Sequence, residues 1–107
     1  EVLAKLEALG MLENTIIMYS SDNGAEAFTW PDGGTTMFRG EKNTQWEGGY
    51  RVPTMIKWPG VIKPSVYEKE LVDFCDVLPT LCEAGQAPLP ENYPGDGVSL
   101  WPVLSQS

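Results

Sequence analysis

Residues 15–20, with the sequence TIIMYS, form an apolar run that strongly limits what this chain can fold into. A run this short and this rich in isoleucine is typical of a buried strand in an α/β sheet. It ends abruptly at Ser21, Asp22 and Asn23, which are followed by Gly24. Open α/β sheets place their ligand sites just beyond the carboxyl ends of such strands. The sequence therefore predicts a carboxylate and a carboxamide where a metal ion could be held.

Local signals predict a helix–strand unit, then a long loop, a second strand and a short helix. Spaced apolar residues at the start of the chain share one helical face, and Gly10 is the expected stop of that helix. Residues 24–49 show little periodicity and are expected to form a long ordered loop, which in compact domains is often functional. Residues 52–58 are typical of a strand. Asp76 is the candidate N-cap of the short helix, which ends near Gly85.

The chain has 107 residues, 42% of them hydrophobic, which suits one globular unit rather than two. No apolar stretch approaches the roughly 18 residues of a membrane-spanning helix, and the start does not resemble a signal peptide, so no membrane partner is predicted. Because the chain begins at Glu1 inside a predicted helix, we interpret residues 1–107 as a single partial domain. Cys75 and Cys82 are expected to be small buried apolar residues. The localisation stays open.

The charge pattern argues against one class of partner and suggests another. The net charge of −8, from 15 acidic and 7 basic residues, argues against nucleic acid. Six of the seven basic residues fall within residues 39–69, which makes that span locally positive. This fits a local anion site, although scattered surface lysines would give the same pattern. Histidine is absent, so a self-contained catalytic triad or a zinc site of the usual kind is not expected.

Two groups of residues are candidates for binding chemistry. Asp22 and Asn23 offer the hard oxygen ligands that Ca²⁺ or Mg²⁺ prefers, although Asp-Asn-Gly is also a common tight turn. Two oxygens are too few for Ca²⁺, so further ligands would have to come from elsewhere. Lys42, which lies among the small residues Gly40, Asn43 and Thr44, could meet a tetrahedral anion as a point charge. The alternative for Lys42 is a solvated surface lysine.

Glu47 and Arg51 lie on either side of the paired glycines Gly48 and Gly49. We expect the two charged residues to form a structural ion pair at the base of the loop rather than to bind a substrate. The glycines indicate backbone that adopts a positive φ or passes close to a neighbour. Trp46 could line a pocket, although packing in a core is the favoured interpretation.

Taken together, these motifs resemble the sulfatase family of the alkaline-phosphatase-like superfamily. The motifs follow one another in a specific order: Ser21-Asp22-Asn23-Gly24, Gly40-x-Lys42, Trp46-Glu47-Gly48-Gly49-x-Arg51-Val52-Pro53, Trp58-Pro59-Gly60, Asp76-Val77-Leu78-Pro79-Thr80-Leu81 and Asp96-Gly97-Val98-Ser99-Leu100. The resemblance implies a fragment of an alkaline-phosphatase-like α/β sandwich, in which residues 24–49 form an active-site loop. It also implies the C-terminal part of the catalytic domain of an arylsulfatase-like sulfuric ester hydrolase.

The resemblance implies roles for three residues. Asp22 and Asn23 would ligate a divalent cation, usually Ca²⁺ with Mg²⁺ as the alternative, and Lys42 would contact the sulfate ester. The family's nucleophile is a formylglycine made from the first residue of a Cys/Ser-x-Pro-x-Arg motif, and no such motif occurs here. The nucleophile, further metal carboxylates and catalytic histidines are expected upstream. The isolated chain is therefore expected to be inactive.

Two other functions stay open at this point. A phosphoester or phosphonate hydrolase of the same superfamily would show similar charge and geometry, and Lys42 does not separate the two. A non-catalytic fragment that binds a cation or assembles is the third hypothesis. Because the strand at residues 15–20 is apolar on both faces and lacks cover, a homo-oligomer or a swapped assembly of the isolated chain is expected.

Overall fold

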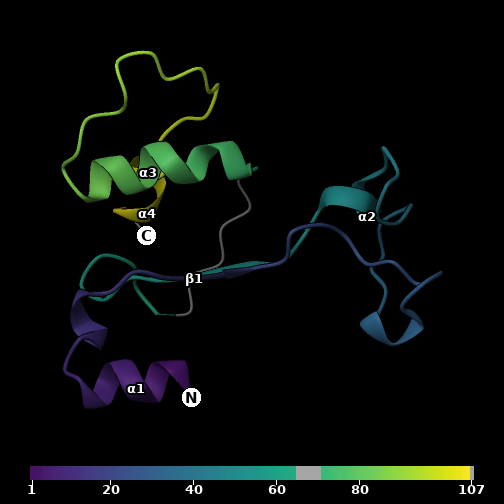
Figure 1. The fold of residues 1–107 in the computed structure, drawn as a ribbon, viewed down its shortest axis with the longest axis horizontal. Helices are drawn as coiled ribbons and strands as arrows, with labels where there is room; N and C mark the ends of the chain where they lie inside the picture. Colours follow the sequence, from purple (N-terminus) through teal and green to yellow (C-terminus); the bar gives the residue numbers. More distant parts are fainter. Residues whose placement is uncertain (65–70, 107) are drawn as a thin grey trace. The chain divides into compact units, whose positions relative to one another are not determined.

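The computed structural model describes residues 1–64 and 71–106. Residues 65–69, the end of the locally positive span predicted at residues 39–69, therefore lie outside the described residues. The elements in chain order (Figure 1) are α1 (Val2–Ala8), the 3₁₀ helix η1 (Leu12–Asn14), β1 (Ile17–Ser20), η2 (Pro31–Gly33), α2 (Glu47–Tyr50), β2 (Thr54–Lys57), η3 (Phe74–Asp76), α3 (Val77–Ala84) and α4 (Trp101–Leu104). They fall into two compact units, which are described separately. One contains Glu1–Thr15 and Trp58–Ser107, and the other contains Ile16–Lys57.

In the first unit, α1 ends as the sequence predicts. Gly10 has φ +67°, a conformation that side chains other than glycine rarely adopt. Its N–H donates to the Glu7 carbonyl (2.9 Å), and the Met11 N–H donates to the Leu6 carbonyl (2.9 Å). These two bonds are the Schellman motif, which satisfies the last carbonyl groups of a helix. The glycine stop is therefore confirmed.

The start of the second helix in this unit differs from the prediction. Asp76 precedes α3 but makes no side-chain cap for it. The capping carboxylate is that of Asp73, which caps the preceding η3 by accepting the Cys75 N–H (3.0 Å). The buried Asp76 side chain instead accepts the N–H groups of Asp73 and of Val98, each at 2.9 Å. Asp76 thus ties the start of α3 to a segment 22 residues away, a partner that local sequence does not reveal.

In the second unit, β1 and β2 pair antiparallel, with Ile17 opposite Lys57 and Ser20 opposite Thr54. The hydroxyl groups of Ser20 and Thr54 lie 2.9 Å apart and form a hydrogen bond. Both strands are shorter than predicted from residues 15–20 and 52–58. For β2 the reason is Pro53, which has no N–H to contribute to the ladder, so the strand begins at the next residue.

The long loop predicted at residues 24–49 contains η2 and the start of α2. Gly48 and Gly49 lie in α2 although glycine is a poor helix former. Both are buried, and a Cβ on Gly48 would collide with the Gly40 carbonyl oxygen. A Cβ on Gly24 would likewise collide with the Gly48 carbonyl oxygen. Close backbone approach, one of the two expected reasons for these glycines, is therefore confirmed.

Apolar side chains are poorly covered in this chain. Among the described residues no hydrophobic side chain is fully buried, and Met18 and Tyr19 of β1 are 39% and 65% exposed. The prediction of a buried first strand is therefore wrong for this chain taken alone, because β2 is the only described strand beside it. The prediction of two buried cysteines is also wrong, since Cys75 is exposed and Cys82 is half-buried.

We expect the isolated chain to form dimers or swapped assemblies, or to leave residues 24–49 partly ordered. Exposed apolar strands gain free energy by pairing with another copy, at roughly 25 cal/mol per Å² of apolar surface buried. Light scattering should therefore report a mass above the monomer's 11.8 kDa. Met18→Lys should lower that mass because it charges the exposed strand face. A uniform monomer whose loop resists proteolysis would contradict this expectation.

Candidate metal and anion site

Asp22 and Asn23 lie just beyond β1, separated from its last residue, Ser20, by Ser21 alone, so they stand past the end of the strand as the sequence predicts. The Asp22 side chain is exposed and makes no hydrogen bond or ion pair with any described residue. The half-buried Asn23 donates its Nδ2 to the Gly24 carbonyl oxygen (2.9 Å). This bond fixes the amide group and leaves its Oδ1 without a partner among the described residues. Two oxygen donors, one anionic and one neutral, are therefore available side by side in the sequence for a hard cation.

These two oxygens form only part of a metal site. Within residues 1–64 and 71–106, no group of three or more acidic, cysteine or histidine side chains could hold a metal ion. Ca²⁺ takes about six to eight oxygen ligands. The donor set at Asp22 and Asn23 therefore fits a divalent cation in its chemistry, and the remaining ligands would have to come from other parts of a larger protein.

Lys42 lies in a tight turn formed by residues 40–44. The turn is bounded by Gly40 with φ +86° and by Asn43 with φ +70°, and the Thr44 N–H closes it by donating to the Glu41 carbonyl oxygen (3.0 Å). The glycine is needed there for space as well, because a Cβ on Gly40 would collide with the Thr44 hydroxyl group. The small residues around Lys42 that the sequence singles out thus shape the turn that presents it.

This turn contacts the segment that follows the candidate metal ligands. The Lys42 N–H donates to the Ala25 carbonyl oxygen (3.0 Å), and Ala25 lies only two residues beyond Asn23. A second backbone bond, from the Gly24 N–H to the Gly49 carbonyl oxygen (2.9 Å), joins α2 to the same segment. The fold therefore brings the backbone of the predicted anion-binding lysine to within two residues of the predicted metal ligands.

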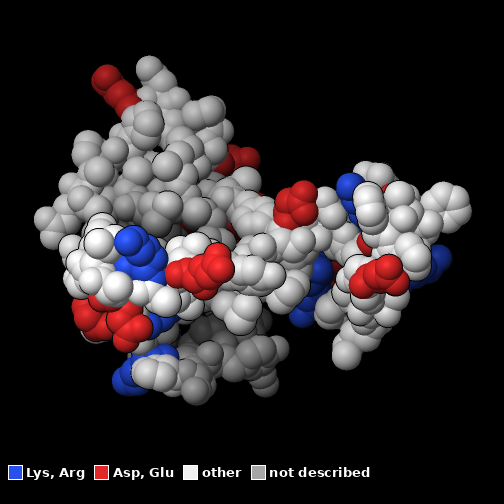
Figure 2. Space-filling view, turned by 60° about the horizontal axis from the view of Figure 1, so that its bottom comes forward, with Lys and Arg blue, Asp and Glu red and all other residues white. Residues whose placement is uncertain are grey.

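The Lys42 ammonium group has one described ionic partner, the Glu26 carboxylate at 3.8 Å. This distance is too long for a direct hydrogen bond, and the lysine side chain is 40% exposed. Figure 2 shows that acidic and basic side chains are mixed over the coloured surface of that view. Lys42 and Arg51 of the locally positive span each pair with a glutamate, so the charge of that span is partly offset, and Lys42 stays accessible to an external anion.

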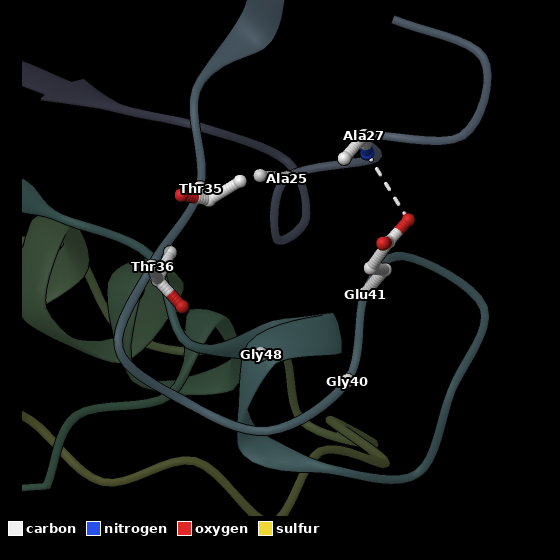
Figure 3. Close-up of a pocket in the computed structure, with 7 residues that line it drawn as sticks. All are labelled: Ala25, Ala27, Thr35, Thr36, Gly40, Glu41 and Gly48. Atoms are coloured by element: carbon white, nitrogen blue, oxygen red, sulfur yellow. Dashed lines mark hydrogen bonds between the residues drawn. The ribbon is translucent and has the colours of Figure 1, made fainter. Parts of the chain in front are cut away.

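A hollow of about 180 Å³ lies beside the turn that contains Lys42, and the turn residues Gly40 and Glu41 help to line it. Figure 3 shows how the lining residues are arranged. The residues that line the hollow are Ala25, Ala27, Thr35, Thr36, Gly40, Glu41 and Gly48. The Glu41 carboxylate spans one side of the hollow and accepts the Ala27 N–H (3.0 Å). Glu41 is not among the candidates predicted from the sequence, because nothing local connects a carboxylate at position 41 with N–H groups 13 and 14 residues earlier.

The predicted ion pair of the loop is present. Arg51 Nη1 lies 3.2 Å from Glu47 Oε2, one helical turn apart, and both side chains are about half exposed. An exposed pair of this kind contributes little to stability, so its role in supporting the loop stays a prediction. The Arg51 guanidinium also lies over the Phe38 ring (4.2 Å to the centroid). The favoured core role of Trp46 is wrong, since the ring is half exposed and stacks with Arg39 (3.8 Å).

The two cysteines do not resemble nucleophiles. Cys75 donates a hydrogen bond to the Asp73 carboxylate, and this bond together with the nearby negative charge raises the pKa of the Cys75 thiol. The reactive thiolate form is therefore disfavoured. In return, the backbone N–H of Cys75 lowers the pKa of Asp73. Neither Cys75 nor Cys82 precedes the x-Pro-x-Arg sequence of the expected nucleophile motif.

Comparison with known proteins decides the family. A family model described as Sulfatase matches residues 1–87. The chain belongs to the sulfatase family. It is 43% identical over 97 residues to human arylsulfatase A, covering 90% of this chain and 19% of that protein. It is also 38% identical over 105 residues to an arylsulfatase of Hemicentrotus pulcherrimus, covering 97% of this chain and again 19% of that protein.

The fold of this sulfatase segment is also that of solved sulfatases. A crystal structure described as the PsFucS1 sulfatase from Pseudoalteromonas sp. matches with a TM-score of 0.87 and 39% identity, over 97% of this chain and 21% of that one. The predicted assignment to a fragment of the alkaline-phosphatase-like α/β fold is therefore confirmed. The chain spans about a fifth of the length of the relatives that it matches. A membrane-spanning helix is absent from residues 1–64 and 71–106.

Proposed function

We propose that the protein to which this sulfatase segment belongs hydrolyses sulfuric esters of the arylsulfatase type. In this proposal the segment contributes Asp22 and Asn23 as ligands of a divalent cation and Lys42 as a contact to the sulfate group. One observation carries the proposal. The hydrogen bond from the Lys42 N–H to the Ala25 carbonyl oxygen joins the lysine turn to the chain that continues directly from Asp22 and Asn23.

The proposed contribution of Lys42 is electrostatic. A sulfate monoester already carries a negative charge, and further charge grows on its oxygens as the ester bond breaks. An ammonium group held beside these oxygens stabilises the transition state more than the ground state. The loose 3.8 Å pair with Glu26 supports this role, because a sulfate oxygen can replace a partner that is not directly hydrogen-bonded.

The proposed contribution of Asp22 and Asn23 is to hold the cation, with Ca²⁺ favoured over Mg²⁺ by the mixed carboxylate and amide donors. Bound there, the cation would act as a Lewis acid that polarises the sulfate oxygens. The bond from Asn23 Nδ2 to Gly24 supports this role, because it leaves the amide oxygen free for a ligand. The nucleophile, expected to be a formylglycine, would come from outside these 107 residues.

Comparing sulfate with phosphate esters in the full-length protein tests the proposal. We expect turnover of 4-nitrophenyl sulfate with a higher kcat/KM than that of 4-nitrophenyl phosphate. The isolated 107-residue chain should show no turnover above that of its own Lys42→Ala variant, because it lacks a nucleophile and most metal ligands. A higher kcat/KM for the phosphate ester would favour the alternative hypothesis of a phosphoester hydrolase. Sulfate turnover by the isolated chain above its Lys42→Ala variant would contradict the assignment of the nucleophile to another part of the protein.

A further inference from the structure

We propose that Glu41 is a positioning residue for Lys42, an inference that rests on the proposed function. The Glu41 carboxylate would set the place of the lysine turn by binding the backbone that follows the metal-ligating residues. Lys42 would then meet the sulfate group from a fixed turn rather than from a mobile loop.

The contacts of the Glu41 carboxylate are the basis for this inference. Its Oε2 accepts the N–H groups of Ala27 (3.0 Å) and Phe28 (3.4 Å), as Figure 3 shows for the first of them. Hydrogen bonds to an ionised acceptor are roughly twice as strong as those between neutral groups. Together with the bond from the Lys42 N–H to Ala25, they attach two consecutive residues of the turn to one short segment.

The turn is also held by hydrogen bonds of its own. The Thr44 hydroxyl donates to the Glu41 carbonyl oxygen (2.6 Å) and accepts the Glu41 N–H (3.1 Å). Thr44 therefore fixes the conformation of the turn, and Glu41 fixes its position. Because Lys42 is the next residue after Glu41, a shift of the carboxylate anchor would move the lysine backbone with it.

Glu26 cannot provide the same positioning. It lies 3.8 Å from the Lys42 ammonium group and competes with a sulfate group for the same charge. Glu41, in contrast, binds only backbone N–H groups in this unit and leaves the ammonium free. The two carboxylates therefore have separate roles: Glu41 sets the place of the lysine, and Glu26 is the partner that the sulfate group replaces.

A double-mutant cycle in the full-length protein tests this inference. Glu41→Ala should lower kcat/KM for 4-nitrophenyl sulfate about tenfold, less than the roughly hundredfold cost of a 1 Å misplacement. In a Lys42→Ala background the same change should cost less than about twofold, because residues that act through one another are not additive. Glu41→Gln keeps an acceptor oxygen and should therefore retain most of the wild-type kcat/KM. Glu83→Ala, which removes an exposed carboxylate in α3, is the matched control and should leave kcat/KM unchanged.

The outcomes separate this inference from the proposed function. If Lys42→Ala alone leaves activity intact, the sulfate contact that the proposed function gives to Lys42 is wrong and the positioning role falls with it. If Lys42→Ala is impaired but Glu41→Ala costs the same in both backgrounds, only the positioning role is wrong. Should Glu41→Ala fail to fold, Glu41→Asp replaces it in the cycle, because it retains the charge and withdraws the carboxylate by one methylene group.

Discussion

Lys42→Ala in the full-length sulfatase should lower kcat/KM for an aryl sulfate by about 10²–10³-fold, equivalent to about 2.7–4 kcal/mol of transition-state stabilisation. This is the cost measured elsewhere for removing one group that stabilises a developing oxyanion. Lys42 has the required properties, since its ammonium group is 40% exposed and its described ionic partner lies 3.8 Å away. Steady-state kinetics on the purified variant would measure the loss.

Two further variants make this result specific. Lys63→Ala removes an exposed lysine that makes no ion pair with a described residue, and it should leave kcat/KM unchanged. Lys42→Arg keeps the positive charge but replaces a compact ammonium with a planar fork, so it should recover only part of the activity. Wild-type kcat/KM in a folded Lys42→Ala variant would show that the lysine is a solvated surface residue.

The sequence alone was sufficient to predict the features that depend on residues close together in the chain. The glycine stop of α1 follows from a conformation that only Gly10 reaches without strain, and the Schellman bonds involve residues at most five apart. The end of β1 at Ser20, just before Asp22 and Asn23, follows from an abrupt change from apolar to polar residues. For the same reason, the two candidate metal ligands could be named from the sequence.

Contacts between segments that are far apart in the sequence could not be predicted from it. The anchoring role of Glu41 depends on N–H groups 13 and 14 residues earlier in the chain. Most of α2 falls within residues 24–49, which are predicted as loop because they show little periodicity. The missing side chain of Gly48 allows the backbone at Gly40 to approach, and that of Gly49 does the same for the backbone at Thr44. Trp46 was expected in a core, but its ring stacks with Arg39 at the surface. In each case a tertiary contact overrides the local preference.

Asp22→Ala should abolish both metal binding and activity in the full-length protein. Removing a residue that only hydrogen-bonds to a metal ligand typically costs about 10–100-fold in metal affinity. Removing an anionic ligand itself should therefore cost more. Metal analysis of the purified variant should therefore find little Ca²⁺, and the wild type should retain it after gel filtration. Asp32→Ala is the matched control, because Asp32 is exposed in η2 and makes no described hydrogen bond or ion pair.

The isolated chain provides an independent readout of the same site. At this site it offers the Asp22 carboxylate and the Asn23 amide oxygen, and residues 1–64 and 71–106 contain no group of three or more acidic side chains that could hold a metal ion. Calorimetry should therefore detect weak Ca²⁺ binding or none, against micromolar or tighter binding expected for a complete site of about six to eight oxygens. Micromolar binding by the isolated chain that survives Asp22→Ala would place the cation elsewhere. In that case the charge that holds a sulfate group next to Lys42 could not come from the end of β1.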